Sequence, residues 1–423
     1  MICPLRKIAL FFSIVPALVW GEEGSVVTDE VAFLDQVVNE LMVDESVEDI
    51  KDAMDWELEL DSLIYGSMDE LYNINMGSRL DIGLSTGVGY RENILYQAND
   101  DAVNSSFGFI GLDIFGQYQF EQTEDQFEFM ILGDDSHFID QSELSDDVFV
   151  SIGLDYLTDR FGIGEVGAGF SGFYTTSSFD VDVDEPAVVN SGRNGNIHLN
   201  WNPRLLSQGT EIEVAQGRYL SGFDSSTYNF TTISYSEKFQ MGEKLDYLIG
   251  FDAKKKRYPH ATAFDEGGNS IEGGEKDVTR LSAVFSLIRR LELGEHKLRA
   301  KLIVEGYKES SSVSRYYDRG RASLGGQVRW RHGAWSIESK IEYQRTEYDI
   351  RTADLAFVPV DPLYGELINE DDWSWLIEVE HEFSNGWTGF LNWNGSDVES
   401  NDVGSSYDSN SIMLGLRAPS FFL

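Results

Sequence analysis

The sequence predicts an all-β protein, a transmembrane up-and-down antiparallel β-barrel of about 16 strands, with 14 to 18 as the accepted range. Two independent observations carry this prediction. Apolar and polar residues alternate over segments of about ten residues, the length that a tilted strand needs to cross a bilayer. The connections between these segments alternate between tight turns and long polar loops, which is typical of a membrane barrel with two different rims.

The clearest alternating segment runs from His296 to Lys308. One row is apolar and the other is largely charged, which is the pattern of a strand with one oily face and one wet face. The apolar row is Leu298, Ala300, Leu302, Val304 and Gly306, and the polar row contains Lys297, Arg299, Lys301, Glu305 and Tyr307. Only Ile303 breaks the pattern, because it is apolar among the charged positions.

Similar alternation recurs along the rest of the chain, although it is weaker near 195–203, 210–218 and 226–240. The other expected strands lie near 78–94, 110–121, 127–131, 148–156, 166–170, 247–253, 281–287, 324–330, 337–343, 375–379, 387–393 and 408–422. Strands in hydrocarbon must satisfy every backbone N–H and C=O, so the sheet has to close on itself. We therefore expect the first strand to pair with the last.

The connections between the expected strands fall into two classes. Tight turns are expected at Gln122–Asp125, Thr158–Arg160, Met241–Gly242, Glu292–Glu295, His332–Ala334 and Ser384–Gly386. Long acidic loops are expected at 95–104, 134–146, 180–194, 259–276, 351–371 and 395–408. The tight turns would lie on the periplasmic side, because the chain enters from that side and its first connection is long.

Three parts of the chain differ in composition. Residues 1–21 have a basic start and a short apolar run, which predicts a secretory signal peptide containing Cys3, the only cysteine. Residues 22–77 form an acidic periplasmic segment with helical spacing between 31 and 54, either a plug for the barrel or a partly ordered leader. Residues 78–423 would form the barrel.

The formal net charge of −41 argues against a nucleic-acid partner, because phosphates would be repelled. The charge is unevenly distributed, however. Residues 251–351 contain 20 of the 32 Lys and Arg residues against 15 acids. We therefore expect one basic sector in an otherwise acidic barrel.

If the apolar rows face lipid, the alternate rows line the lumen. The expected basic wall consists of Arg280, Arg299, Lys301, Arg329, Arg331 and Lys340. The expected acidic wall consists of Asp81, Asp113, Glu128 and Asp155, and Glu305, Glu338 and Glu342 share the basic sector. Opposed walls would set up a transverse field that selects among ions. The alternative is that these charges only pair across strands and keep the lumen hydrated.

Aromatic residues suggest the two membrane interfaces. Tyr90, Tyr118, Tyr156, Trp201, Trp330, Trp375, Trp387 and Trp393 are expected to form the aromatic girdle. Stacking platforms for sugars are the alternative interpretation of the same residues. No cofactor is expected, since the six histidines lack metal-ligand spacing and no nucleophile is paired with a base, which also argues against an enzyme.

Acidic groups at Asp134–Asp135, Asp180–Glu185, Glu370–Asp372 and Asp397–Asp402 could collect divalent cations, although solvated loop charge explains them as well. Other expected partners are outer-membrane lipid, lipopolysaccharide and small polar solutes. A homo-oligomer is left open by the sequence.

The segment at 87–94, Gly-Val-Gly-Tyr-Arg-Glu-Asn-Ile, follows the expected signal and acidic leader. With its Gly87, Gly89, Tyr90 and Asn93 pattern and its repeated hairpins, the chain resembles the outer-membrane β-barrel porins of Gram-negative bacteria, specifically the β-barrel porin 2 group. The resemblance implies a barrel in the bacterial outer membrane that passes small polar or charged solutes by diffusion. A structural or adhesive barrel, or one associated with exopolysaccharide secretion, remains an alternative, as does a soluble exported β-protein that binds polysaccharide.

Overall fold

The computed structural model describes residues 79–94, 103–120, 125–141, 144, 146–179, 188–203, 209–222, 224–242, 244–266, 270–352, 366–402, 406–419 and 421–422. The expected signal peptide, the acidic segment 22–77 and the acidic group at Asp180–Glu185 lie outside these residues. Within the described residues, no helix is long and apolar enough to span a membrane.

Nearly all described residues belong to one antiparallel sheet. Its strands are β1 (Arg79–Arg91), β2 (Ser105–Gln119), β3 (Gln126–Phe138), β4 (Asp147–Thr158), β5 (Gly164–Phe179), β6 (Val188–Pro203), β7 (Thr210–Ser221), β8 (Tyr228–Gln240), β9 (Leu245–Phe264), β10 (Ser270–Leu293), β11 (His296–Ser311), β12 (Arg319–His332), β13 (Trp335–Thr352), β14 (Leu367–Glu382), β15 (Thr388–Ser400), β16 (Tyr407–Arg417) and β17 (Phe421–Phe422). Two 3₁₀ turns, η2 (Asp224–Ser226) and η3 (Arg315–Tyr317), lie in connections.

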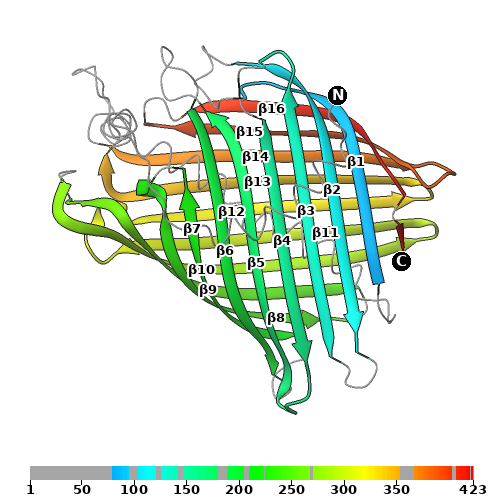
Figure 1. The fold of residues 1–423 in the computed structure, drawn as a ribbon, viewed down its shortest axis with the longest axis horizontal. Helices are drawn as coiled ribbons and strands as arrows, with labels where there is room; N and C mark the ends of the chain where they lie inside the picture. Colours follow the sequence, from blue (N-terminus) through cyan, green and yellow to red (C-terminus); the bar gives the residue numbers. More distant parts are fainter. Residues whose placement is uncertain are drawn as a thin grey trace, which may run out of the picture. The chain divides into compact units, whose positions relative to one another are not determined.

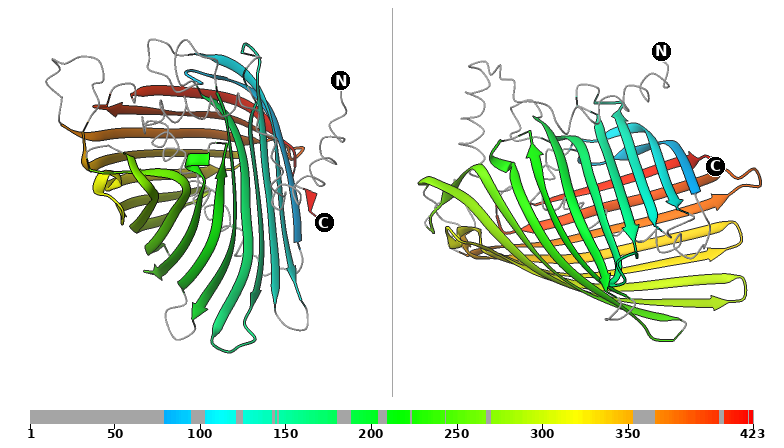
Figure 2. Two further views of the ribbon diagram at one scale, coloured as in Figure 1. Left: turned by 60° about the vertical axis from the view of Figure 1, so that its left-hand side comes forward. Right: turned by 60° about the horizontal axis from the view of Figure 1, so that its bottom comes forward.

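The sheet closes into a barrel of 16 long strands, as the sequence predicted (Figures 1 and 2). Each strand pairs with its neighbours in sequence, and β1 pairs with β2 on one side and with β16 on the other. The short β17 continues the edge of β16, because Phe421 and Phe422 pair with Ile82 and Asp81 of β1. The three weakly patterned segments are complete strands, β6, β7 and β8.

Several predicted loops are wrong in extent, because the hairpins continue as polar strands. β9 and β10 run to Phe264 and from Ser270, so most of the expected loop 259–276 is paired sheet. β3 includes Asp134 and Asp135, β14 includes Glu370 to Asp372, and β15 reaches Ser400. An antiparallel pair satisfies its own backbone hydrogen bonds, so it can continue beyond its apolar part without alternating hydrophobicity.

The two faces of the barrel wall differ as the alternation predicted. Many large apolar side chains are exposed on one face of most strands, including Leu302 and Val304 on β11 and Leu414 and Leu416 on β16. Directly opposite residues in an antiparallel pair point to the same face, so register extends this apolar face around the barrel. The face with exposed apolar residues is the outer one, and the alternate rows point inward.

The closing seam explains the glycines near the loop-side end of β1. On the inner face, a Cβ at Gly87 would lie 2.5 Å from Cε1 of Phe109, and a Cβ at Gly89 would lie 2.4 Å from Cζ of Phe107. Phe107 is buried with Ile94 and Phe138. The two glycines therefore leave room for aromatic rings of β2 to pack over β1.

Asn93 fixes the chain where it leaves this seam. Its φ of 51° lies in the left-handed region, which asparagine tolerates better than most residues. The Asn93 N–H donates to Asn104 Oδ1 (2.8 Å), and its side-chain amide donates to the carbonyl of Asp408 at β16 (2.8 Å). One residue therefore ties the first loop to the last strand.

Candidate functional site: the inner wall of the barrel

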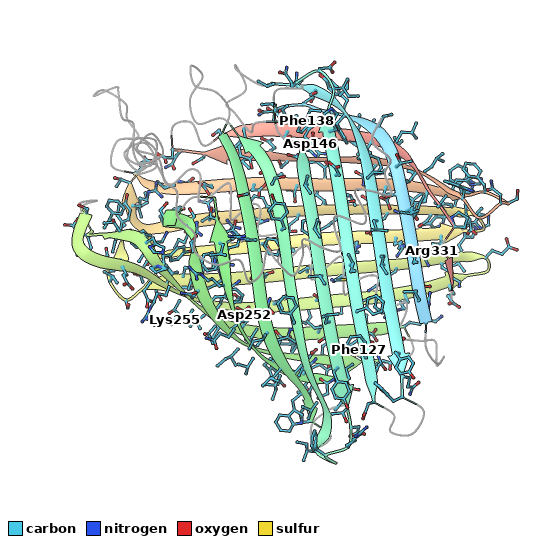
Figure 3. The ribbon with its side chains drawn as sticks, in the orientation of Figure 1. Phe127, Phe138, Asp146, Asp252, Lys255 and Arg331 are labelled. Carbon is cyan, nitrogen blue, oxygen red and sulfur yellow. The ribbon has the colours of Figure 1, made fainter. Side chains whose placement is uncertain are left out.

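All the residues expected in the basic and acidic walls lie in inward-facing rows. Figure 3 draws the side chains along the strands and labels one member of this set, Arg331. Arg299 of β11 lies opposite Arg329 of β12, which in turn lies opposite Glu338 of β13. Lys301 lies opposite Gln327, and Gln327 opposite Lys340. Their role in selecting solutes stays a prediction, but their placement on one wall follows directly from the register.

Basic and acidic side chains are interleaved in this sector. The Nε atom of Arg329 lies 3.6 Å from Oε2 of Glu338, and Gln327 donates to the other oxygen of that carboxylate (2.7 Å). Lys340 Nζ lies 3.9 Å from Glu342 Oε2. The remaining members, Arg331 and Glu305, lie opposite Ser336 and Ser323. The cross-strand pairing that the sequence left as an alternative is thus present in part.

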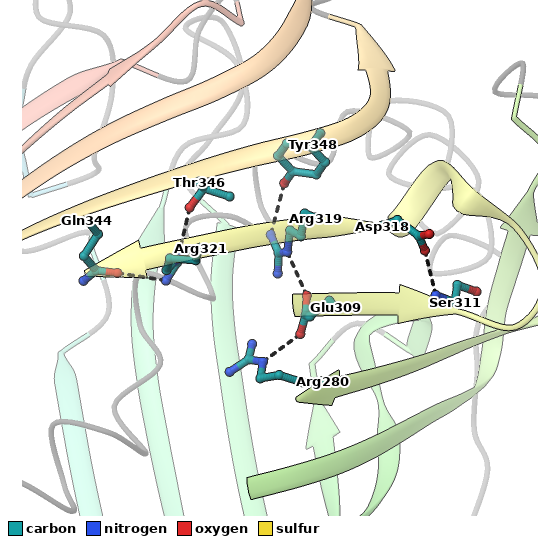
Figure 4. A network of polar contacts seen from close by, with 9 residues as sticks. All are labelled: Arg280, Glu309, Ser311, Asp318, Arg319, Arg321, Gln344, Thr346 and Tyr348. Carbon is teal, nitrogen blue, oxygen red and sulfur yellow. Dashed lines mark hydrogen bonds and ion pairs between the residues drawn. The ribbon is translucent and has the colours of Figure 1, made fainter. Parts of the chain in front are cut away.

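A buried network of polar contacts in the wall is centred on Glu309 (Figure 4). One carboxylate oxygen accepts from Arg280 Nε and the other from Arg319 Nε, both at 2.8 Å. Arg319 Nη1 also donates to the hydroxyl of Tyr348 (3.0 Å). All four residues lie in one register row across β10–β13. Two arginines therefore share the carboxylate of Glu309.

Arg321 extends the network toward the turn side with a different set of partners. Its Nε donates to Thr346 Oγ1 (2.9 Å) and its Nη1 to Gln344 Oε1 (3.1 Å), both neutral acceptors. Its guanidinium carbon lies 5.4 Å from the centre of the Tyr307 ring, and that of Arg280 lies 4.3 Å from the same ring. Among the described residues, Arg321 is therefore held in place by neutral groups.

Several inward-facing cations were not predicted from the sequence. Lys254, Lys256 and Lys276 are buried, and their ammonium groups lie over the rings of Phe230 (4.9 Å), Tyr228 (5.1 Å) and Tyr258 (4.8 Å). Arg351 lies over Tyr348 at 5.3 Å. Cation–π contacts of this kind stabilise a charge that has left bulk water. The pattern was missed because Lys254 to Arg257 is an unbroken basic run, in which alternation cannot be seen.

The predicted acidic wall lies on β1–β4, on the opposite side of the closed barrel from the basic sector. Its residues are Asp81, Asp113, Glu128 and Asp155. Asp81 pairs with Arg79 on its own strand (2.5 Å), and Glu128 accepts from Gln126. Asp113 is close in register to Asp134, a further inward-facing acid that the sequence had assigned to a loop. This wall therefore holds more acid than was expected.

Asp155 reaches across a whole strand. Its Oδ1 lies 2.7 Å from Nε2 of His198 on β6, although β5 runs between them. The contact exists because the intervening residue is Gly169, where a Cβ would lie 2.3 Å from that oxygen and 2.4 Å from that nitrogen. Two further acids of β7, Glu211 and Glu213, also point toward the inside of the barrel.

Ile303 has a simple packing explanation. It lies opposite Ser286 of β10 and Gly325 of β12, and a Cβ at Gly325 would meet the Ile303 Cβ at 3.7 Å. The side chain thus lies beside two small residues. An apolar residue there covers the bare backbone of its neighbours.

The expected girdle residues all lie on the outer face. Tyr118, Tyr156, Trp201 and Trp330 are near the turn-side ends of their strands, Trp387 directly precedes β15 in the turn, and Tyr90 is near the loop-side end of β1. Trp375 and Trp393 are instead near the middle of β14 and β15, with ring centroids 6.3 Å apart.

Three histidines that the sequence left unassigned join the turn-side aromatics. The rings of His296 and His332 stack at 4.2 Å, and His381 lies 4.3 Å from Trp335. The four residues share one outward register row across β11–β14. Such amphipathic rings suit the headgroup depth of a bilayer.

The acids expected to collect cations are mostly in strands. Asp134 faces inward and Asp135 outward, so the two carboxylates point to opposite sides of the wall. In the part of the chain that the structure describes, no group of three or more His, Asp or Glu side chains could hold a metal ion. The cation interpretation of these strand acids is therefore not supported by their geometry.

No protein-family model matches the sequence, and no curated protein matches it. Among solved structures, the chain is similar to OccAB1 of Acinetobacter baumannii, with 10% identity over 82% of this chain and 97% of that chain, and a TM-score of 0.44. It is also similar to OccK2 of Pseudomonas aeruginosa (12%, 81% and 98%, TM-score 0.41) and to OmpT, an outer membrane protein of Vibrio cholerae (11%, 82% and 99%, TM-score 0.41). Likeness at this level carries no inference about function.

Proposed function

We propose that this chain is an outer-membrane porin through which small polar or charged solutes diffuse. The observation that supports the proposal is a closed barrel of 16 long strands whose outward rows are apolar and whose inward rows are charged. A closed antiparallel barrel leaves no unpaired edge, as hydrocarbon requires. At about 16 strands a barrel is wide enough to hold water, whereas about eight strands leave an interior that side chains fill.

The inner wall supports a mechanism based on electrostatic selection. Lys254, Lys256, Arg280, Arg319 and Arg321 gather on β9–β12, and Asp113, Asp134 and Asp155 lie on β2–β4. Opposed charges of this kind orient a solute that carries a charge or a dipole, and they weight the passage of anions against cations. No covalent step is involved, because the solute only exchanges its water for wall contacts as it diffuses.

The single-channel conductance of the purified full-length protein in a planar bilayer tests the proposal. We expect discrete ohmic steps, and a reversal potential in a salt gradient that reports the balance between the two walls. Arg321→Gln should move this reversal potential toward cation selectivity, because the bonds of Arg321 to other described residues go to neutral oxygens. A barrel that inserts correctly but never conducts would refute the porin proposal.

A deletion experiment tests whether the segment from 22 to 77 is a leader or a plug. Removing residues 25–72 should leave the conductance unchanged if the segment is a leader, and should increase it if the segment is a plug. Membership in the β-barrel porin 2 group is likewise a proposal. It is supported by Gly87, Gly89, Tyr90 and Asn93, which lie at the closing seam between β1 and β16.

A further inference from the structure

A patch of cations lies on the outer face of the barrel, near the loop-side end of β7 and in the loop-side half of β9. In the register, Arg218 of β7 lies opposite Asn229 of β8, and Asn229 lies opposite Arg257 of β9. Lys255 is two residues nearer the middle of β9 and points the same way. Two strand spacings place the Arg218 and Arg257 backbones about 10 Å apart, so their long side chains can reach a common ligand.

The charges of this patch are only partly balanced by the protein. Asp277 of β10 lies opposite Arg257 in the register, yet its carboxylate binds Lys255 Nζ at 3.0 Å. Arg218 and Arg257 are exposed, and among the described residues neither has a hydrogen-bond or ion-pair partner. Two guanidinium groups are therefore available to an anion from outside the chain.

An apolar surface lies directly beneath the cations on the same strands. The row formed by Val214, Ile233, Ala253 and Leu281 runs across β7–β10, and Val214, Ile233 and Leu281 are exposed. Only one row of uncharged or paired side chains, which contains Lys255 and Thr231, separates it from the arginines. Successive outward rows are about 7 Å apart along a strand, so acyl chains and a headgroup phosphate can engage both surfaces at once.

The outer face of β10 at its other end lacks such an arrangement. Arg289, near the turn side, lies between the outward-facing Leu287 and Leu291 and opposite Leu245 and Ala300. The cations gather instead at the rim that carries the long loops, which is the outer leaflet in the proposed orientation. Outer-leaflet glycolipids combine phosphates with several acyl chains, and guanidinium groups bind phosphate with two parallel hydrogen bonds.

We propose that Arg218, Arg257 and Lys255 bind the phosphate of an outer-leaflet glycolipid, with its acyl chains against Val214, Ile233 and Leu281. The inference rests on the proposed membrane placement and orientation of the barrel, but not on the barrel being an open pore. Lys255 contributes its ammonium group, since its side chain is 54% exposed beside Asp277 and a phosphate can reach it.

Native mass spectrometry of the full-length protein in detergent tests this site. The probes are a hexa-acylated glucosamine disaccharide with two phosphates, the same lipid without phosphates, and phosphatidylglycerol. We expect the phosphorylated disaccharide to bind best, because it offers both phosphate and several chains. Changing Arg218→Gln and Arg257→Gln together should weaken its binding by roughly tenfold or more, since charge-assisted hydrogen bonds are lost.

Matched variants separate this site from general adhesion of lipid. Arg289→Gln removes one exposed cation from the same face at the opposite rim, and should leave binding unchanged. Arg218→Lys with Arg257→Lys keeps the charge, and should retain most of the affinity. Equal binding of phosphorylated and dephosphorylated lipid, equal binding of phosphatidylglycerol, or an equal loss with Arg289→Gln would each overturn the proposal. The conductance of the glutamine variant should match that of the unchanged protein, so a failure of the porin proposal is scored separately.

Discussion

Alanine at Gly89 should destabilise the closing seam of the barrel. The added Cβ would lie 2.4 Å from Cζ of Phe107 and 2.6 Å from the carbonyl oxygen of Ile412, closer than carbon atoms approach in proteins. The Phe107 ring cannot easily move, because it is 2% exposed and packs against Ile94 and Phe138. The Ile412 oxygen is part of the β16 backbone. Relief therefore requires a shift of β1 against β16, and overpacking of this kind costs about 1–3 kcal/mol.

Reversible urea unfolding of the barrel in lipid vesicles, followed by tryptophan fluorescence, measures the change in free energy of unfolding. Gly108→Ala is the matched control, since the nearest atom to its Cβ would be the Gly87 carbonyl oxygen at 4.0 Å. That variant should be neutral or slightly stabilising, because alanine restricts the unfolded chain. If the free energy of unfolding is the same for Gly89→Ala and Gly108→Ala, the seam packing described here is wrong.

Three further tests probe the two faces and the inner wall. Leu302→Arg should make folding into lipid less favourable by about 2–4 kcal/mol if the residue is near the midplane. Arg299→Ala should instead change ion selectivity with little loss of stability. Equal effects of the two changes would refute the face assignment. Glu309→Gln should destabilise the barrel in the same urea assay by about 3–5 kcal/mol, because it removes the carboxylate shared by two buried arginines, and a neutral result would contradict the bonding of that network. Gly169→Ala should separate Asp155 from His198 and shift the pH dependence of conductance near neutrality. Gly153→Ala is the control that should have no effect, because the nearest atom to its Cβ would be Met130 Cε at 3.8 Å.

The faces of the barrel wall were predictable because the side-chain period of a strand is two. Once Leu302 and Val304 are placed in lipid, Arg299, Lys301 and Glu305 must point inward. The closed sheet of 16 long strands followed from the same alternation and from the requirement that hydrocarbon leaves no free edge. Both arguments use only local pattern and solvent, so they needed no knowledge of which strand residues are paired.

The bonding of the inner wall was not predictable, because it depends on register. Glu309 lies between Arg280 and Arg319 only because the turn at 294–295 and the connection at 312–318 set the alignment of β10, β11 and β12. A shift by one residue would move Glu309 to the outer face. In the same way, the contact between Asp155 and His198 depends on a glycine in the strand between them, and no periodicity reports that.

The excess of positive charge between 251 and 351 shows that composition alone cannot assign cations to the inner or the outer face of the barrel. In the sequence these cations form one basic sector. The alternation of side chains along each strand places some of them on the inner face of the barrel and others on the outer face. Arg280, Arg319 and Arg321 face the lumen, whereas Lys255 and Arg257 face outward at the loop-side rim. Under the proposed function, the first group acts on a solute inside the barrel and the second on a lipid outside it. Charge reversal at Arg257 should therefore leave ion selectivity unchanged, while the same change at Arg321 should alter it, even though both residues belong to the same basic sector of the sequence.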